Sequence, residues 1–218
     1  MVNIKNIYFT YCYFCIIISQ FEFVNNNFNE TGGYAVLIRN REQDLETILF
    51  AEPEIAHRAE ELGKELDTLL NGERPIMACV LKGAVFFFTD LCRRMESPVD
   101  LDFIQVSSYG SGTTSSGKIR LKKDMERNVE GRTVVLVEDI VDSGLTLRYL
   151  GELLKERGAA RVLTVAFLDR GKPATDLKGF SVGGEFVVGY GLDYAEHYRN
   201  LPYIAALKPE CYTDEITS

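Results

Sequence analysis

The stretch Thr133–Arg157, TVVLVEDIVDSGLTLRYLGELLKER, decides the fold of this chain. Its first five residues, Thr133–Val137, are β-branched or apolar, as is typical of a strand buried on both faces. Acids and a small, hydroxylated turn follow at positions 138–146, and an amphipathic helix is then expected up to Gly158, a natural C-terminal cap. The stretch therefore predicts a strand–turn–helix unit of an α/β protein.

The turn of this unit has the chemistry of an anion site. Ser143-Gly144-Leu145-Thr146 lies at the start of the expected helix, where free backbone N–H groups and the positive end of the helix dipole converge. A single carboxylate here would be an ordinary helix cap. Three of them, Glu138, Asp139 and Asp142, repel one another unless a cation or hydroxyl groups lie among them. A sugar phosphate with a metal-bound tail meets this demand, whereas the Gly-Lys-Ser/Thr and G-x-G-x-x-G nucleotide loops are absent from the sequence.

The rest of the chain alternates between strand and helix patterns. Strands alternating with helices indicate a mostly parallel sheet with crossover connections, and ligands bind at the carboxyl ends of such strands. We therefore expect Lys82-Gly83, Glu138-Asp139, Arg170 and Asp193 to converge. The expected helices are Pro53–Leu70 and Ala84–Met95, and the expected strands are Pro75–Leu81, Val99–Val106, Arg161–Leu168, Phe186–Tyr190 and Tyr203–Leu207.

Composition bounds the partners and the compartment. The chain has 218 residues and a formal net charge of −8, which argues against nucleic acid or an anionic membrane as the main partner. Its five cysteines are irregularly spaced and do not indicate a disulfide framework. Cys12 and Cys15 have redox or metal spacing without a second pair or a histidine, and the other three are typical of thiols in a reducing cytoplasm. The two histidines lack metal-ligand spacing.

Residues 1–33 form an atypical extension outside the expected domain at 34–218. The apolar run Ile7–Ile18 is short for a membrane span, and Glu22 follows it closely. A signal peptide is poorly supported, because Lys5 is the only cation before the run and no clear small-residue cleavage site follows. An extension or a mis-assigned start is the favoured interpretation, and an anchor or targeting role is the alternative.

From about Ile38 onward the sequence resembles the hypoxanthine-guanine phosphoribosyltransferase family, which belongs to the type I phosphoribosyltransferases. The matching motifs occur in order: Leu81-Lys82-Gly83, Ser108-Tyr109 with the Gly/Ser/Thr tract 110–117, the acidic stretch 138–146, Phe186–Tyr194, and Arg199. The resemblance implies a twisted, mostly parallel sheet flanked by helices, a small hood lobe and a flexible loop over the site. It also implies a non-proline cis peptide in the diphosphate loop at Leu81-Lys82-Gly83.

The family pattern assigns a role to each residue of the acidic stretch. It implies that Glu138 and Asp139 bind the ribose hydroxyls and that Asp142 is the general base for the purine nitrogen that attacks C1 of the sugar. The 5′-phosphate would be held by Ser143, Gly144, Leu145 and Thr146, where Leu145 replaces a residue that is often polar.

The later motifs concern the base and the diphosphate. The resemblance implies that Phe186 stacks on the purine, that the Val187 backbone reads its edge, and that Arg199 binds the diphosphate. A lysine usually donates to the purine 6-oxo group. An ungapped count from Glu138 places Arg170 at that position, but the segment 172–179 is shortened and Lys172 is also close enough.

The function implied is purine salvage. A 5-phosphoribosyl 1-diphosphate would react with hypoxanthine or guanine to give IMP or GMP and diphosphate, with Mg²⁺ held by Glu138, Asp139 and Asp193. The alternatives are a preference for xanthine or another 6-oxopurine, and a non-catalytic regulator of the same fold. A cytoplasmic homodimer or homotetramer is expected, with small-molecule substrates and neither nucleic acid nor membrane as partner.

Overall fold

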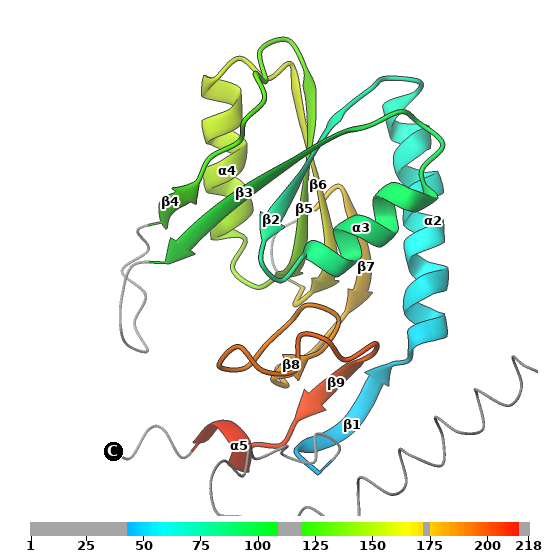
Figure 1. Ribbon diagram of the computed structural model, residues 1–218, viewed down its shortest axis with the longest axis vertical. Coiled ribbons are helices and arrows are strands. Elements are labelled where there is room, and N and C mark those ends of the chain that lie inside the picture. The colour runs from blue at the N-terminus through cyan, green and yellow to red at the C-terminus, as the bar shows by residue number, and fades with distance from the viewer. Residues whose placement is uncertain (1–42, 109–118, 172–174, 214–218) are drawn as a thin grey trace, which may run out of the picture. The chain divides into compact units, whose positions relative to one another are not determined.

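The structure, a computed structural model, describes residues 43–108, 119–171 and 175–213. Internal contacts divide the chain after Arg39, and every described residue belongs to the second unit. This unit contains a six-stranded sheet and a separate three-stranded sheet (Figure 1). The predicted boundary between residues 33 and 34 lies outside the described residues and stays a prediction.

The six-stranded sheet has the order β4-β3-β2-β5-β6-β7. Strands β3, β2, β5, β6 and β7 run parallel to one another, and the edge strand β4 is antiparallel to β3. The carboxyl ends of the central strands therefore share one edge of the sheet. The bounds are β2 Ile76–Leu81, β3 Asp100–Ser108, β4 Ile119–Lys123, β5 Thr133–Val141, β6 Arg161–Asp169 and β7 Leu177–Ser181.

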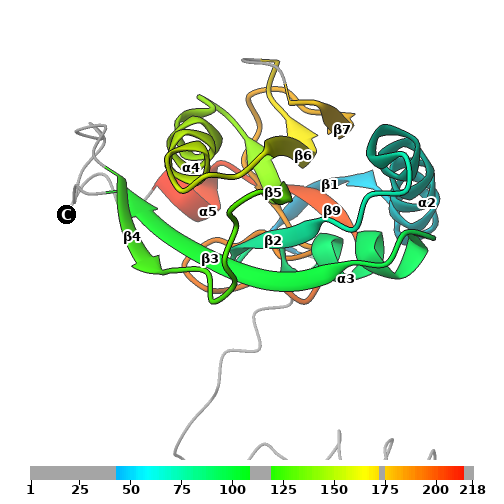
Figure 2. The same ribbon diagram turned by 90° about the horizontal axis from the view of Figure 1, so that it is seen from above.

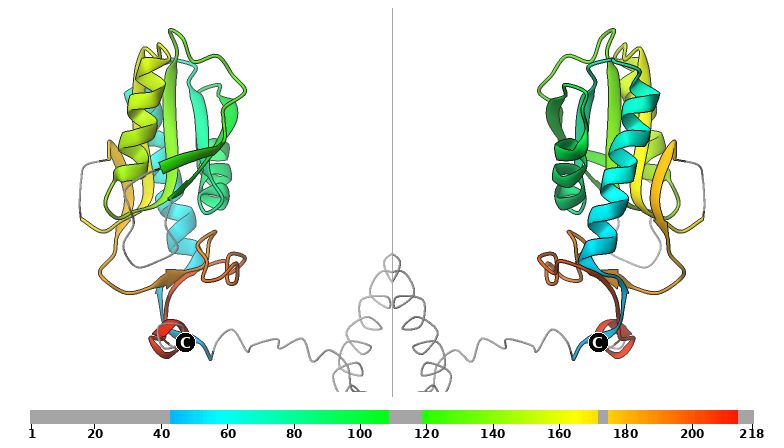
Figure 3. Two further views of the ribbon diagram at one scale, coloured as in Figure 1. Left: turned by 90° about the vertical axis from the view of Figure 1, so that its left-hand side faces the viewer. Right: turned by 90° about the vertical axis from the view of Figure 1, so that its right-hand side faces the viewer.

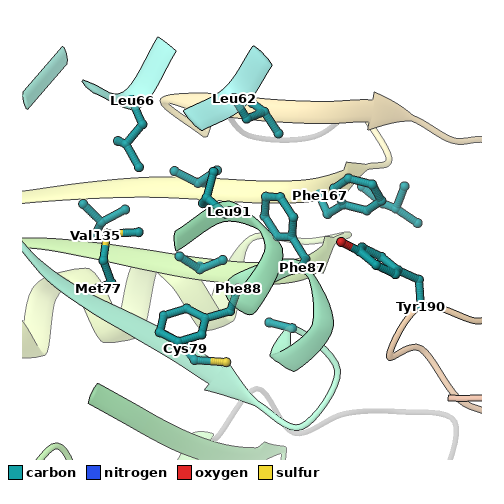
Figure 4. Close-up of a cluster of buried hydrophobic side chains, with 14 of the residues drawn as sticks. Leu62, Leu66, Met77, Cys79, Phe87, Phe88, Leu91, Val135, Phe167 and Tyr190 are labelled. Atoms are coloured by element: carbon teal, nitrogen blue, oxygen red, sulfur yellow. The ribbon is translucent and has the colours of Figure 1, made fainter. Parts of the chain in front are cut away.

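Helices cover both faces of this sheet, as Figure 2 shows from above. Alternate residues of a strand point to opposite faces, so Val135 and Val137 pack with α2 (Glu52–Leu70) and α3 (Val85–Arg94), and Val134 and Leu136 pack with α4 (Leu145–Glu156). On the first face, leucines of α2 and phenylalanines of α3 meet β2, β5 and β6 (Figure 4). The two cores hold the central strands rigidly beneath the site.

The three-stranded sheet forms the hood. Its order is β1-β9-β8, all antiparallel, with bounds β1 Leu45–Phe50, β8 Val187–Val188 and β9 Ile204–Leu207. The short helix α5, Glu210–Thr213, follows β9. Figure 3 shows the hood lying beyond the edge of the main sheet at which its parallel strands end.

The predicted α/β fold, with a mostly parallel sheet, flanking helices and a hood, is confirmed. The predicted strand Phe186–Tyr190 is shorter than expected, because Gly189 and Tyr190 adopt positive φ angles of 98° and 48° and turn the chain. The predicted loop over the site, at 109–117, lies outside the described residues. None of the helices in the described ranges is both long and apolar enough to cross a membrane.

Candidate active site at the carboxyl edge of the sheet

The predicted site residues gather where β2, β5 and β6 end. These strands are parallel neighbours, so Leu81, Val141 and Asp169 end at the same edge of the sheet. Beyond β6, the backbone N–H of Arg170 donates to the Val141 oxygen at 3.0 Å. The segments that carry the acids, the diphosphate loop and Arg170 therefore converge, as the sequence predicted.

A small hollow lies at the N-terminus of α4. It has a volume of about 140 Å³ and is lined by the turn between β5 and α4, from Ile140 to Leu147, together with Glu138. Gly144 occupies the N-cap position with φ 69°, and it has no side chain that could cap the first turn. The N–H groups at the helix start are thus suited to an anion. Asp142 and Leu145 are exposed beside the hollow, Leu145 to 40%.

The adjacent acids Glu138 and Asp139 lie at this edge of the sheet, where Glu138 is buried and Asp139 is half-buried. The strand prediction ended at Val137, but β5 continues to Val141 because Glu138 and Ile140 pair with β6. Burial, and then the neighbouring Asp139 carboxylate, raise the pKa of Glu138 well above its ordinary value. Burial also raises the pKa of Asp139, although the hydrogen bond from the Ile140 N–H and the charge of Arg199 act in the opposite direction.

The Glu138 carboxylate has one buried oxygen, Oε2, without a hydrogen-bond partner. A buried, unpaired acceptor of this kind is costly in the ligand-free protein and requires a donor or a cation. Carboxylates with an unused oxygen suit Mg²⁺, which is usually bound by one or two carboxylates together with substrate oxygens and water. The donor set of Glu138 and Asp139 therefore fits the ion.

The diphosphate loop passes directly over Asp139. The Leu81–Lys82 peptide bond is cis, as the resemblance implied. A Cβ atom on Gly83 would lie 1.5 Å from Asp139 Oδ2, and one on Gly191 would lie 1.9 Å from the Gly83 carbonyl oxygen. Both glycines are needed for this approach, because any side chain would separate the acids from the loop and the loop from the hood.

Ion pairs join the diphosphate loop to the hood. Arg199 Nη2 lies 2.8 Å from Asp193 Oδ1, and Arg199 Nη1 donates to the Gly191 oxygen at 2.8 Å. Glu196 accepts from Arg199 Nε at 3.3 Å and from Lys82 Nζ at 3.0 Å. Lys82 of the loop and Arg199 of the hood are therefore both paired with carboxylates.

Comparison with known proteins identifies this arrangement. Residues 46–195 match the family model described as a phosphoribosyl transferase domain. The chain is 48% identical over 174 residues to hypoxanthine-guanine phosphoribosyltransferase of Bacillus subtilis, covering 78% of this chain and 97% of that protein. The chain belongs to the hypoxanthine-guanine phosphoribosyltransferase family.

Two further relatives bear on the extent of the match. A crystal structure of hypoxanthine phosphoribosyltransferase from Staphylococcus aureus superposes with a TM-score of 0.76 at 37% identity, covering 81% of this chain and 99% of that one. The bifunctional protein TilS/HprT of Listeria monocytogenes is 51% identical over 178 residues, covering 78% of this chain. The chain thus spans about a quarter of the length of that bifunctional relative, with 27% of it covered.

The predicted purine-binding segment of this phosphoribosyltransferase lies in the hood. The Phe186 ring stacks on Tyr212 with centroids 5.1 Å apart and meets the Tyr194 ring edge-on at 5.5 Å. Val187 is buried in β8 opposite Ala206 of β9. An aromatic ring supported from two sides forms a rigid wall for a planar base.

A hydrogen bond between Tyr190 and Asp90 fastens this segment to α3. The Tyr190 hydroxyl donates to Asp90 Oδ2 at 2.7 Å, and Asp90 Oδ1 pairs with Arg94 at 3.1 Å. The Tyr190 ring lies near Phe167 and the phenylalanines of α3 (Figure 4). Because α3 begins directly after the diphosphate loop, this bond holds the base segment and the diphosphate loop together.

The three acids that the sequence assigned to the metal do not form one group. In the described ranges, no cluster of three or more His, Cys, Asp or Glu side chains has the spacing of a metal site. Glu138 and Asp139 adjoin each other, whereas Asp193 is occupied by Arg199. A metal ion held here would therefore have two protein carboxylates, Glu138 and Asp139, as ligands, and its other ligands would be substrate oxygens or water.

Sequence reasoning missed Glu196, the Tyr190–Asp90 pair and the close approach of Gly191. The spacing of Glu196, three residues from both Asp193 and Arg199, was a usable signal, because both are predicted site residues. The Tyr190–Asp90 contact joins residues 100 positions apart and left no signal in the chain. Of the predicted site residues, Tyr109 and Lys172 lie outside the described residues, as does the side chain of Ser108.

Proposed function

We propose that this protein transfers the phosphoribosyl group of 5-phosphoribosyl 1-diphosphate to hypoxanthine or guanine and so forms IMP or GMP and diphosphate. The observation that carries the proposal is the combination, at one sheet edge, of the hollow at the N-terminus of α4 with the buried Glu138 and the half-buried Asp139. Such a site offers donors to a phosphate and acceptors to sugar hydroxyls side by side. The names of the relatives support hypoxanthine and guanine as the bases.

Each group of the substrates has a proposed partner. The 5′-phosphate occupies the hollow and accepts hydrogen bonds from Ser143, Thr146 and the first N–H groups of α4. Glu138 and Asp139 accept hydrogen bonds from the ribose hydroxyls. The diphosphate lies against the Leu81–Gly83 loop and Arg199, whose planar guanidinium can bind it through two parallel hydrogen bonds.

Asp142 is the proposed general base. As the purine nitrogen forms its bond to C1 of the ribose, the bond from C1 to the diphosphate oxygen breaks and the proton of the imidazole ring passes to the Asp142 carboxylate. Asp142 is exposed beside the hollow that receives the 5′-phosphate, so its side chain can reach a base attached to the same sugar.

Magnesium is the proposed cofactor. Glu138 and Asp139 would hold it, and the ion would supply charge neutralisation for the departing diphosphate. Asp193 is retained as a third candidate ligand, available once a diphosphate has taken its place on Arg199. A cytoplasmic location and assembly as a homodimer or homotetramer remain predictions of the sequence.

The experiment is turnover of the purified protein with four bases. The nucleoside monophosphate formed from hypoxanthine, guanine, xanthine and adenine is measured with saturating diphosphosugar and Mg²⁺. Hypoxanthine and guanine should be substrates, and kcat/KM for adenine should be lower by a factor of about a hundred or more, because its amino group presents a donor where a 6-oxo group accepts. Efficient use of adenine, or turnover with none of the four, would refute the proposal, and a preference for xanthine would replace hypoxanthine as the substrate.

A further inference from the structure

The side chain of Arg170 is engaged by backbone carbonyl groups. Its Nη2 atom donates to the Glu185 oxygen at 2.8 Å, and its Nη1 atom donates to the Gly183 oxygen. A guanidinium presents its donors in a rigid plane and so can bridge two carbonyl groups at once. Arg170 therefore clamps residues 183–185 from the end of β6.

The clamped residues form the passage from the main sheet into the hood. At the start of the passage, the Val182 N–H donates to the Asp169 oxygen at 3.0 Å. Within it, the Gly183 N–H donates to Glu185 Oε1 at 3.0 Å. The next residue is Phe186, whose carbonyl oxygen accepts from the Leu207 N–H at 2.7 Å. The clamp thus acts on the backbone that delivers the Phe186 ring.

The backbone of Arg170 is tied to the opposite side of the site. Its N–H donates to the Val141 oxygen at 3.0 Å, and Asp142 is the residue that follows Val141. On its other side, the Gly171 N–H donates to Asp169 Oδ1 at 2.7 Å. Arg170 is therefore fixed beside the proton acceptor by its main chain and fixed to the base wall by its side chain.

We propose that Arg170 is a positioning residue of the purine site, which sets the Phe186 ring relative to Asp142 and does not itself read the 6-oxo group of the base. The inference rests on the proposed function, in which Phe186 stacks on the purine. The sequence offered two cations for the 6-oxo group, and this inference excludes Arg170 from that role. Arg170 could reach a base only if two carbonyl groups of the passage lost their charged hydrogen-bond donor.

The two roles predict different kinetics. A cation that reads the 6-oxo group favours hypoxanthine over adenine, so its loss removes the discrimination. A cation that positions the stacking ring supports every purine alike, so its loss weakens all of them by the same factor. Neither role involves the diphosphosugar, whose KM serves as an internal reference.

The experiment compares Arg170→Met and Arg170→Lys with wild type. The control is Arg93→Met, which removes an exposed arginine from the last turn of α3. For Arg170→Met we expect KM for hypoxanthine and guanine to rise about ten- to hundredfold, with the ratio of kcat/KM between hypoxanthine and adenine and the KM for the diphosphosugar unchanged. Arg170→Lys should recover part of the loss, because an ammonium keeps the charge but lacks the planar fork. Arg93→Met should behave as wild type.

Two outcomes would overturn the inference. If Arg170→Met brings the hypoxanthine-to-adenine ratio close to one, Arg170 reads the base. If Arg170→Met and Arg170→Lys both match wild type for every base, the clamp does not position the ring. Should Arg170→Met fail to fold, Glu185→Ala tests the same passage by removing the acceptor of the Gly183 N–H, and it too should raise KM for all bases equally; a change in the ratio instead would contradict the inference. A wild type inactive with hypoxanthine and guanine would instead refute the proposed function.

Discussion

Asp142 is the proposed general base, and its side chain is exposed rather than enclosed by the protein. Its side chain is exposed at the end of β5, next to the hollow proposed for the 5′-phosphate. Asp142→Asn keeps the shape and removes only the proton acceptor, so kcat should fall about a hundredfold or more while KM for the diphosphosugar stays near wild type. Steady-state kinetics with hypoxanthine over a range of diphosphosugar concentrations measures both. An unchanged kcat would exclude Asp142 as the base.

The Glu138 side chain, in contrast to that of Asp142, is buried. Its burial disfavours the ionised carboxylate and so lowers the stability of the folded protein where that group is charged. Because its pKa is raised in the folded protein, the folded state keeps a proton on Glu138 at a pH where the unfolded chain has lost it. Its contribution to stability is therefore fully present below the ordinary glutamate pKa of about 4.3 and is lost as the pH rises from there through the raised value.

Glu138→Gln should remove this loss. Without ligand or magnesium, the urea midpoint of wild type should fall from pH 5 to pH 8 more steeply than that of Glu138→Gln, because glutamine does not titrate. The same variant should raise KM for the diphosphosugar at least about tenfold, since it removes a charged acceptor. If the urea midpoints of the two proteins changed equally with pH, ionisation of Glu138 would not be what destabilises the folded protein.

At the scale of elements, the site depends on two glycines at which the diphosphate loop and the hood meet. Gly191→Ala would place a Cβ 1.9 Å from the Gly83 oxygen, at a φ of 103° that other residues rarely adopt. We expect it to destabilise the protein by about 1–3 kcal/mol and to raise KM for the diphosphosugar. Urea unfolding and steady-state kinetics measure the two effects.

The matched control for that substitution is Gly151→Ala in the interior of α4. Apart from its chain neighbours and the adjacent helix backbone, no heavy atom of the described residues lies within 4 Å of the Cβ position there, and alanine favours a helix more than glycine does. This variant should therefore be stabilised by about 0.5–1 kcal/mol with wild-type kinetics. Equal stability of the two variants would show that the approach of Gly191 to Gly83 is not tight in solution.

Elements with a local pattern were predictable and elements made by distant pairing were not. The unit of β5 and α4 follows from its own buried run, acids and turn, and α2 ends at Leu70 as expected, with Asn71 in the left-handed conformation. The strands β1, β4 and β7 were missed because each is short, lies at the edge of a sheet and contains no buried residue. Strand β1 exists through its pairing with β9, such as Leu45 with Leu207.

In the candidate site, too, local patterns were predictable from the sequence and contacts between distant residues were not. Residues within one motif, such as Glu138 to Thr146, were predictable because strand, turn and helix place them together. Contacts between motifs were not, because Lys82 meets Glu196 and Tyr190 meets Asp90 only after the hood has folded onto the main sheet. The role that we propose for Arg170 differs from the one implied by the family pattern for this reason: residue counting gave its position, but the carbonyl groups that it binds belong to the passage into the hood.

At the scale of the whole molecule, the two sheets are proposed to bind different parts of the substrates. The main sheet carries the hollow proposed for the 5′-phosphate, the acids proposed for the ribose and the loop proposed for the diphosphate, and the hood carries the proposed base wall. Phe167 of β6 contacts both Phe87 of α3 and Tyr190 of the hood, so the hydrophobic core continues from one lobe into the other. The two lobes are thereby held together by packing and not only by a single hydrogen bond.

The last prediction concerns the residues that precede this unit. The family match begins at residue 46, and 78% of this chain covers 97% of the Bacillus subtilis relative. Removing residues 1–31 should therefore leave kcat and both KM values within about twofold of the full chain, because every strand and helix of the described site begins later. Expression of both forms, followed by thermal unfolding and turnover with hypoxanthine, makes the comparison. A truncated protein that fails to fold, or that loses a membrane-bound fraction seen with the full chain, would show that the extension belongs to the working molecule.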